Sequence, residues 1–116
     1  MSEQEELLSG LILELRRGTI VLSVLSQLGK PTYGYLLVQE LGERGIPMEA
    51  NTLYPLLRRL EKQGLLKSEW ETAGAKPRKY YVRTELGEAV YQKLKAHWQK
   101  LTKNMEELLG GYESER

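Results

Sequence analysis

Leucines recur at helical spacing between residues 50 and 63 and divide this segment into two unlike faces. At about 100° per residue, one face of a helix collects four leucines: Leu53, Leu56, Leu57 and Leu60. The opposite face collects Asn51, Pro55, Arg58 and Lys62, with Tyr54 and Arg59 on its flanks. A glycine at position 64 suits the end of such a helix. The pattern predicts a helix with one face in a protein core and the other free for a partner.

An alternation with a period of two follows this helix and predicts a β-hairpin. Leu66, Ser68 and Trp70 fall on the same side of the first strand, which places the Trp70 side chain in the core. Residues 72–77 form the predicted loop, because they contain a glycine and a proline, and residues 78–84 form the second strand. A helix that leads into a two-stranded wing is the order of a winged helix-turn-helix.

Three further helices are predicted outside this unit. Apolar spacing predicts helix over residues 7–28, either in one piece or in two pieces broken near Gly18. The next helix covers residues 33–44 and ends at a glycine. The last helix begins after Thr84, which is a suitable N-cap residue.

The last predicted helix carries an apolar seam at heptad spacing. Its members alternate in steps of three and four: Tyr91, Leu94, Trp98, Leu101, Met105 and Leu108. A domain this small has little core left for so long a stripe, so we expect a partner helix from a second copy of the chain. The predicted fold is therefore mostly α with a small β-hairpin. A DNA-binding domain made of an N-terminal helix and a winged helix-turn-helix occupies residues 1–84, and a long C-terminal dimerisation helix occupies residues 85–116.

Composition narrows the class of protein. The 116 residues suit one domain and include no cysteine, so no disulfide or thiolate metal site is expected. This fits a reducing cytoplasm, where we expect the protein to be. The start of the chain is acidic, unlike a signal peptide, and the apolar run of residues 7–15 is too short to span a bilayer. No membrane contact is expected.

The net charge of +1 is unevenly distributed along the chain. Residues 30–84 carry ten basic and six acidic side chains, a net charge of +4. Residues 1–29 carry −2 and residues 85–116 carry −1. The positive excess therefore lies in the predicted winged unit, as expected for a unit that binds nucleic acid.

The sequence contains no clear set of catalytic or metal-binding residues. His97 is the only histidine, so a metal site would depend almost entirely on carboxylates. No acidic cluster has the spacing of a calcium loop, and no phosphate-binding glycine motif follows a strand. We therefore expect no catalytic activity, no metal and no cofactor.

Five short segments stand in a specific order and spacing: residues 17–22, 33–35, 52–61, 77–81 and 84–87. They read Arg-Gly-Thr-Ile-Val-Leu, Tyr-Gly-Tyr, Thr-Leu-Tyr-Pro-Leu-Leu-Arg-Arg-Leu-Glu, Pro-Arg-Lys-Tyr-Tyr and Thr-Glu-Leu-Gly. Together they resemble the PadR family of bacterial transcriptional regulators. The resemblance implies a dimeric, ligand-responsive, winged-helix repressor. The short region after the wing resembles the compact branch of the family, which has a single C-terminal helix.

The predicted DNA-binding surface combines the helix of residues 51–63 with the wing. Base contacts are expected from Asn51 and Thr52, because the N-terminal residues of such helices enter the major groove. Phosphate contacts are expected from five basic residues: Arg58, Lys62, Lys76, Arg78 and Lys79. Three tyrosines complete the surface: Tyr33, Tyr35 and Tyr54. The hydroxyls at positions 33 and 35 suit phosphate contact at a helix N-terminus, although both rings could instead pack on the core.

Trp98 is the candidate ligand-binding residue. In the family that the chain resembles, some compact members carry a tryptophan on the last helix, and two copies sandwich flat aromatic compounds across the dimer. Trp98 falls at the matching position. Each stacked aromatic pair contributes roughly 0.5–1.5 kcal/mol. The alternative is that Trp98 simply fills the interface between two copies.

These expectations describe a homodimeric repressor that a small aromatic ligand releases from a palindromic operator. Its expected partners are double-stranded DNA, a second copy of itself and a planar aromatic molecule. Two other functions stay open: a winged-helix module that binds protein without DNA affinity, and a helical dimer that binds small molecules without regulating genes. The operator sequence, the regulated gene, the effector and the direction of regulation stay open as well.

Overall fold

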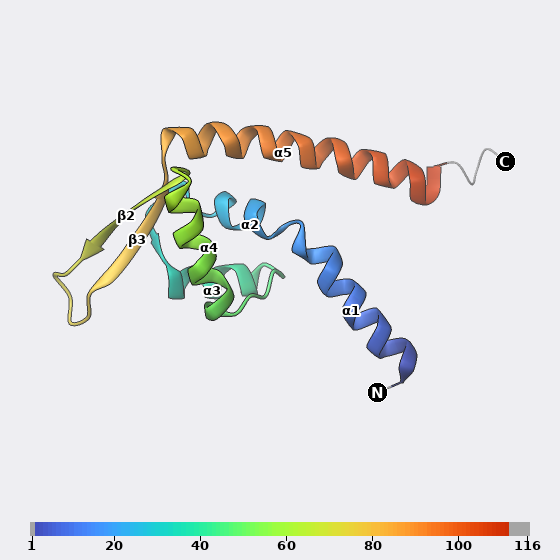
Figure 1. Cartoon of the computed structure of the whole chain (residues 1–116), viewed down its shortest axis with the longest axis horizontal. Coiled ribbons are helices and arrows are strands. Elements are labelled where there is room, and N and C mark those ends of the chain that lie inside the picture. Colours follow the sequence, from blue (N-terminus) through green and yellow to red (C-terminus); the bar gives the residue numbers. More distant parts are fainter. Residues whose placement is uncertain (1, 112–116) are drawn as a thin grey trace.

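The structure, a computed structural model, describes residues 2–111 and contains five α-helices, three β-strands and one short π-helical turn (Figure 1). The helices are α1 (Glu3–Arg17), α2 (Ile20–Ser26), α3 (Gly34–Glu43), α4 (Ala50–Lys62) and α5 (Glu85–Glu106). The strands are β1 (Thr32–Tyr33), β2 (Leu66–Glu71) and β3 (Arg78–Arg83), and the π-helical turn η1 (Glu107–Gly111) continues α5. The end of the predicted segment 85–116 lies outside the described residues.

The predicted fold class is confirmed, with one added strand. β3 is the central strand of an antiparallel sheet, and Tyr81 of β3 lies opposite Ser68 of β2 and Thr32 of β1. The sequence pattern missed β1, because a strand of two residues is too short to show alternation. The helix predicted from Tyr33 therefore begins at Gly34.

Of the two possibilities left open for residues 7–28, one helix or two pieces, the structure shows two pieces with a break near Gly18. α1 ends at Arg17, and α2 begins after Thr19. The Thr19 hydroxyl and the Thr19 amide both donate to the Arg16 carbonyl, at 2.8 Å and 2.9 Å, and so satisfy an acceptor at the end of α1. A capping box between Ser2 and Glu5 starts α1 at its other end.

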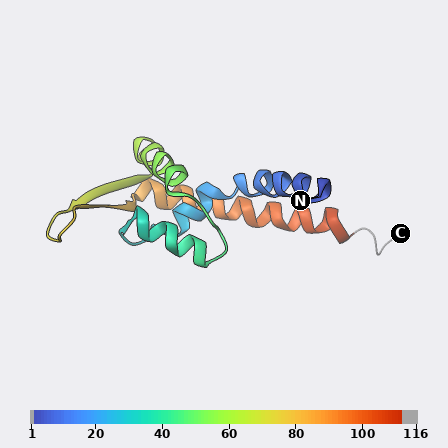
Figure 2. The same cartoon turned by 90° about the horizontal axis from the view of Figure 1, so that it is seen from below.

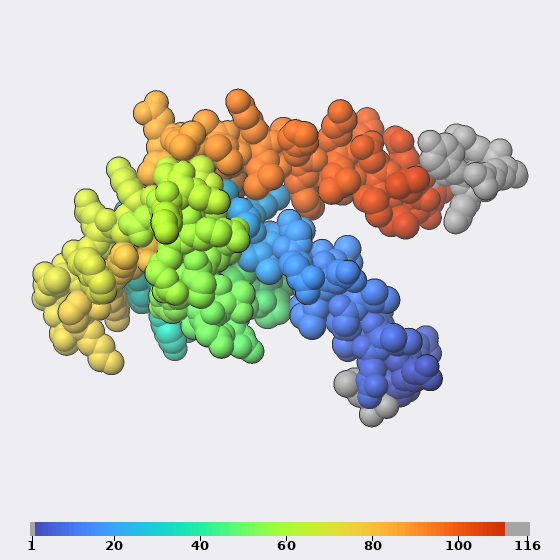
Figure 3. Space-filling view, viewed as in Figure 1, coloured from blue at the N-terminus to red at the C-terminus, as the bar shows by residue number. Residues whose placement is uncertain are grey.

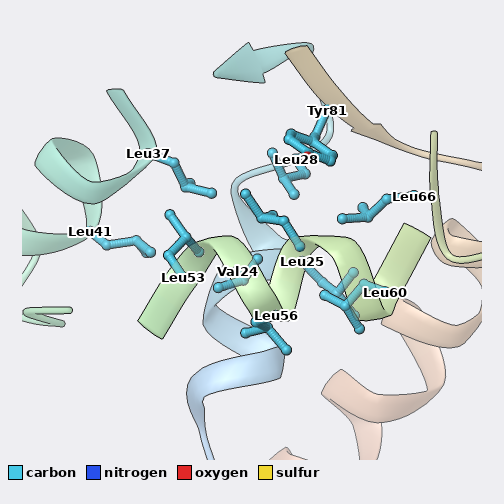
Figure 4. Close-up of a cluster of buried hydrophobic side chains, with 11 residues drawn as sticks. Val24, Leu25, Leu28, Leu37, Leu41, Leu53, Leu56, Leu60, Leu66 and Tyr81 are labelled. Atoms are coloured by element: carbon cyan, nitrogen blue, oxygen red, sulfur yellow. The ribbon is translucent and has the colours of Figure 1, made fainter. Parts of the chain in front are cut away.

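The core lies where α2, α3, α4 and the sheet meet (Figure 4). The leucine face of α4 is buried as predicted, and Leu53, Leu57 and Leu60 are almost completely inaccessible to solvent. Gly64 ends α4 in the left-handed region with φ of +82°, which glycine adopts at little cost. Because the leucines hold one side of α4, its other side is exposed along the whole helix.

The prediction that Trp70 lies in the core is wrong, since 64% of this residue is exposed. The alternation itself is present: Leu66 is buried and Ser68 is half-buried on the same side of β2. The hairpin, however, extends beyond the helices that cover its base (Figure 1). The Trp70 side chain therefore lies on the predicted side of the sheet, but beyond the end of the core.

The wing joins α5 through two packed residues. Arg83, at the end of β3, donates from its backbone to the Leu28 carbonyl, and its guanidinium lies 3.2 Å from the Glu88 carboxylate and 4.4 Å from the centre of the Tyr91 ring. Thr84 caps α5 as predicted, because its hydroxyl accepts a hydrogen bond of 2.9 Å from the Gly87 amide.

α1 and α5 extend away from the rest of the chain on the same side, opposite the wing (Figures 1 and 2). An open wedge separates them in the space-filling view (Figure 3). None of residues 3–17 is buried. The radius of gyration is 17.6 Å, whereas a compact domain of this length would have one of about 13 Å. Large parts of two amphipathic helices therefore lack a packing partner within residues 2–111.

Candidate nucleic-acid interface

The outer face of α4 presents four of the predicted DNA-contacting side chains to solvent. Asn51, Thr52, Arg58 and Lys62 are all exposed. The buried leucines on the other side of the helix hold this face outward. A rigid helix with exposed polar and basic side chains has the form needed to enter a major groove.

The other six predicted residues meet at one cleft of about 510 Å³ between the wing and the first turns of α3 and α4. The lining residues are Tyr33, Gly34, Tyr35, Tyr54, Trp70, Lys76, Pro77, Arg78 and Lys79. Three of them are basic, and four are aromatic. Residues from four separate stretches of the chain thus form one surface, and only the folded chain shows this.

Gly34 determines where the Tyr54 ring lies. A Cβ atom at position 34 would be 2.5 Å from the nearest ring atom of Tyr54, well inside van der Waals contact. The absence of a side chain at Gly34 lets the ring lie directly over the start of α3. Tyr54 thereby connects the outer face of α4 to the cleft. This role of Gly34 was not predicted from the sequence, although a glycine between two tyrosines at the start of a helix was a usable signal.

Tyr33 and Tyr35 occupy different environments. Tyr33 is half-buried, with its ring edge-on to Tyr80 at 5.3 Å, and the Arg78 guanidinium lies 4.4 Å from the ring centre. Tyr33 therefore supports a basic residue of the wing. Tyr35 is 64% exposed and is free to contact a partner directly.

The three basic residues of the wing also differ from one another. Lys79 lies 3.7 Å from the Glu61 carboxylate of α4, so part of its charge faces the protein. A partly exposed ion pair of this kind contributes about 1 kcal/mol or less. Lys76 and Arg78 are exposed near the loop of the hairpin and have no salt bridge among the described residues. They are therefore the wing cations best placed for an external anion.

A second, more apolar hollow of about 430 Å³ lies between α2 and α5. Its lining residues are Gly18, Val21, Leu22, Leu94, His97, Trp98 and Leu101. Trp98 is 45% exposed there, so a single copy of the chain leaves its ring partly uncovered. The contribution of α2 to this hollow was not predicted, although the apolar residues on all sides of that helix were a signal for it.

Between residues 2 and 111, no group of three or more histidine, cysteine or acidic residues is arranged to hold a metal ion. In the same part of the chain, no helix has both the length and the apolar character needed to cross a membrane.

Comparisons with known proteins give the chain its family. Residues 21–93 match the PadR-like family of transcriptional regulators. The transcriptional regulator Rv3488 of Mycobacterium tuberculosis is 33% identical over 99 residues, covering 84% of this chain and 90% of the relative. These matches confirm the resemblance found in the sequence.

Solved structures agree with this assignment. A PadR family transcriptional regulator from Eggerthella lenta is similar with a TM-score of 0.87 at 54% identity, covering 92% of this chain and 96% of that chain. A PadR family regulator from Clostridium difficile has a TM-score of 0.74 at 30% identity, covering 79% of this chain and 99% of that chain. The chain therefore belongs to the PadR-like family, whose members are transcriptional regulators and not enzymes.

Proposed function

We propose that this protein is a homodimeric, cytoplasmic repressor that binds a palindromic operator and leaves it when a flat aromatic compound binds beside α5. The observation that carries this proposal is the continuous surface of α4 and the wing, where basic and tyrosine side chains surround one cleft. Residues 1–84 would bind DNA, and residues 85–116 would hold two copies together.

The exposed apolar faces of α1 and α5 support a dimer. The chain exposes 8923 Å², whereas a compact monomer of this length would expose about 6500 Å². The excess is about 2400 Å² per chain, or about 4800 Å² for two copies, which lies within the total of about 2000–5000 Å² that obligate dimers bury between subunits. A two-fold dimer would present two copies of α4, and a palindromic operator matches that symmetry.

The proposed DNA contacts follow from position. Asn51 and Thr52 lie in the first turn of α4, where side chains reach base edges. Arg58 and Lys62 lie further along the same exposed face, and Lys76 lies in the wing. These basic residues would hold the flanking phosphates, which set the register of the protein on the duplex without reading its sequence.

Arg58→Ala is expected to lower the affinity for duplex DNA of any sequence and to flatten its salt dependence. Each phosphate contact contributes about 0.9 to the slope of log K against log salt concentration. A dimer loses two copies of Arg58, so its slope should fall by roughly two units. Fluorescence anisotropy with a labelled duplex of mixed sequence, repeated over a series of salt concentrations, measures both quantities.

Lys103→Ala is the matched control, because Lys103 is exposed near the end of α5 that lies farthest from the wing. This variant should bind DNA like the wild type. An unchanged salt slope for Arg58→Ala would show that α4 is not the DNA-contacting helix. A wild-type protein that binds no duplex even at low salt would instead favour a protein-interaction module.

The hollow beside Trp98 is the proposed effector site. Its lining is mostly apolar, and the exposed indole offers a flat surface for stacking. In a dimer the two copies of Trp98 would enclose a planar ligand. A ligand that separates or tilts the two α5 helices would change the distance between the two α4 helices and so weaken operator binding.

Trp98→Ala is expected to lower the affinity for neutral planar compounds such as 2-naphthol by about tenfold, because an aromatic stacking partner is lost on each subunit. Titration calorimetry without DNA measures this loss. Trp70→Ala removes the other tryptophan and should leave the affinity unchanged. If Trp98 only fills the interface, its truncation should instead cost about 3–5 kcal/mol of stability. A severely destabilised variant would therefore favour that alternative.

A further inference from the structure

The exposure of Trp70 has no explanation within the fold. Its neighbour on the same side of the sheet is Lys79, whose ammonium group lies 6.0 Å from the centre of the indole ring. That single cation covers little of the ring. A large aromatic side chain on a projecting hairpin invites aggregation unless a partner covers it. Its position therefore points to a partner surface.

The cleft identifies the chemistry of that partner. Trp70, Tyr35 and Tyr54 supply flat apolar surfaces, while Lys76 and Arg78 supply positive charge. Among the lining residues that the structure describes, none is acidic. Flat apolar surfaces beside several cations match a strand of nucleic acid, whose backbone alternates sugars with negatively charged phosphates.

The cleft is also continuous with the outer face of α4. Tyr54 belongs to α4 and lines the cleft, with its ring lying over Gly34. A duplex that lies along α4 therefore brings one of its strands to the mouth of the cleft. An acidic peptide or a flat small molecule would not need this continuity.

We infer that Trp70 is a DNA-contacting residue, whose indole packs against the sugar of the strand that passes between the wing and α3, while Lys76 and Arg78 hold the adjacent phosphates. This inference rests on the proposed DNA binding. It assigns to the wing an apolar contact in addition to its charges.

Trp70→Ala is the test. The variant should bind a mixed-sequence duplex about tenfold more weakly, as expected when a stacking or packing contact to nucleic acid is lost. Its salt slope should equal that of the wild type, because no charge is removed. Its thermal stability should also be unchanged, since the indole lies outside the core. Trp70→Phe should recover most of the affinity.

Fluorescence provides an independent readout. In a Trp98→Phe background, Trp70 is the only tryptophan, so its emission should change as duplex is added and should saturate together with the anisotropy. Leu86→Ala is the matched control, because it truncates another exposed apolar side chain that does not line the cleft. This control should change neither affinity nor salt slope.

The outcomes separate the inference from the proposed function. If the wild type binds duplex, Arg58→Ala weakens binding and Trp70→Ala does not, the inference is wrong and the proposed function stands. If Trp70 emission responds to 2-naphthol but not to duplex, the cleft is a small-molecule site and the inference is overturned. If the wild type binds no duplex at low salt, both fail.

Discussion

Replacing Leu101 and Met105 together with lysine is expected to yield a protein that is monomeric or unfolded at micromolar concentration. In one copy of the chain these residues are 58% and 41% exposed, on a helix that extends beyond the core. In the proposed dimer they lie in the seam between subunits, where two lysines per chain would be buried without partners. A buried, unpaired charge costs several kcal/mol. Because dimer and fold are linked in obligate dimers, stability should fall with association.

Sedimentation velocity and circular dichroism together measure this effect. The control is Gln92→Lys with Gln99→Lys, which adds the same charge to exposed polar positions of the same helix away from the seam. The control should remain a folded dimer. A wild-type protein that is a stable monomer at micromolar concentration would contradict the proposed assembly, as would a dimeric lysine variant of the seam.

Gly87→Ala is expected to destabilise the fold by about 3 kcal/mol or more, the upper end of the range for overpacked cores. A Cβ atom at this position would lie 1.9 Å from the Leu65 carbonyl oxygen and 2.9 Å from the carbonyl carbon. Both atoms are backbone, so no side chain can turn aside to make room. The first turn of α5 would have to move, which would strain the cap that Thr84 provides.

Urea denaturation compares this variant with Gly42→Ala, the matched control. Gly42 lies within α3, and a Cβ atom there would meet nothing within 4 Å. Alanine should therefore stabilise the protein at this position, by up to about 1 kcal/mol, since it favours helix over glycine. Equal midpoints for the two variants would show that α5 can shift away from Leu65 at no cost.

Local sequence rules predicted the elements that depend on local physics. The leucine spacing of α4 located its buried face, because a helix with four leucines on one side buries them by packing that side against the core. The cap at Thr84 followed from the chemistry of a single residue, and a glycine at position 18 marked where the first helical segment could break. These features need no knowledge of the rest of the fold.

The features that could not be predicted depend on where residues lie in the folded chain. The alternation in β2 gave the direction of Trp70 correctly, but only the folded chain shows that the core ends before that residue. β1 forms because Thr32 and Tyr33 lie beside β3, and a pair of residues leaves no pattern of its own. Six residues of the cleft were likewise predicted from the sequence as DNA-contacting. That they lie together with Gly34 and Trp70 depends on how the wing packs beside α3.

The position of Arg83 indicates what would follow if the chain were truncated between β3 and α5. Its single guanidinium donates to the Leu25 carbonyl at the end of α2, pairs with Glu88 and covers Tyr91. A chain cut after residue 84 would keep the arginine but lose both of its α5 partners, and it would uncover the part of the core against which Tyr91 packs. We therefore expect the regions with the proposed DNA-binding and dimerisation roles to unfold together as one cooperative unit.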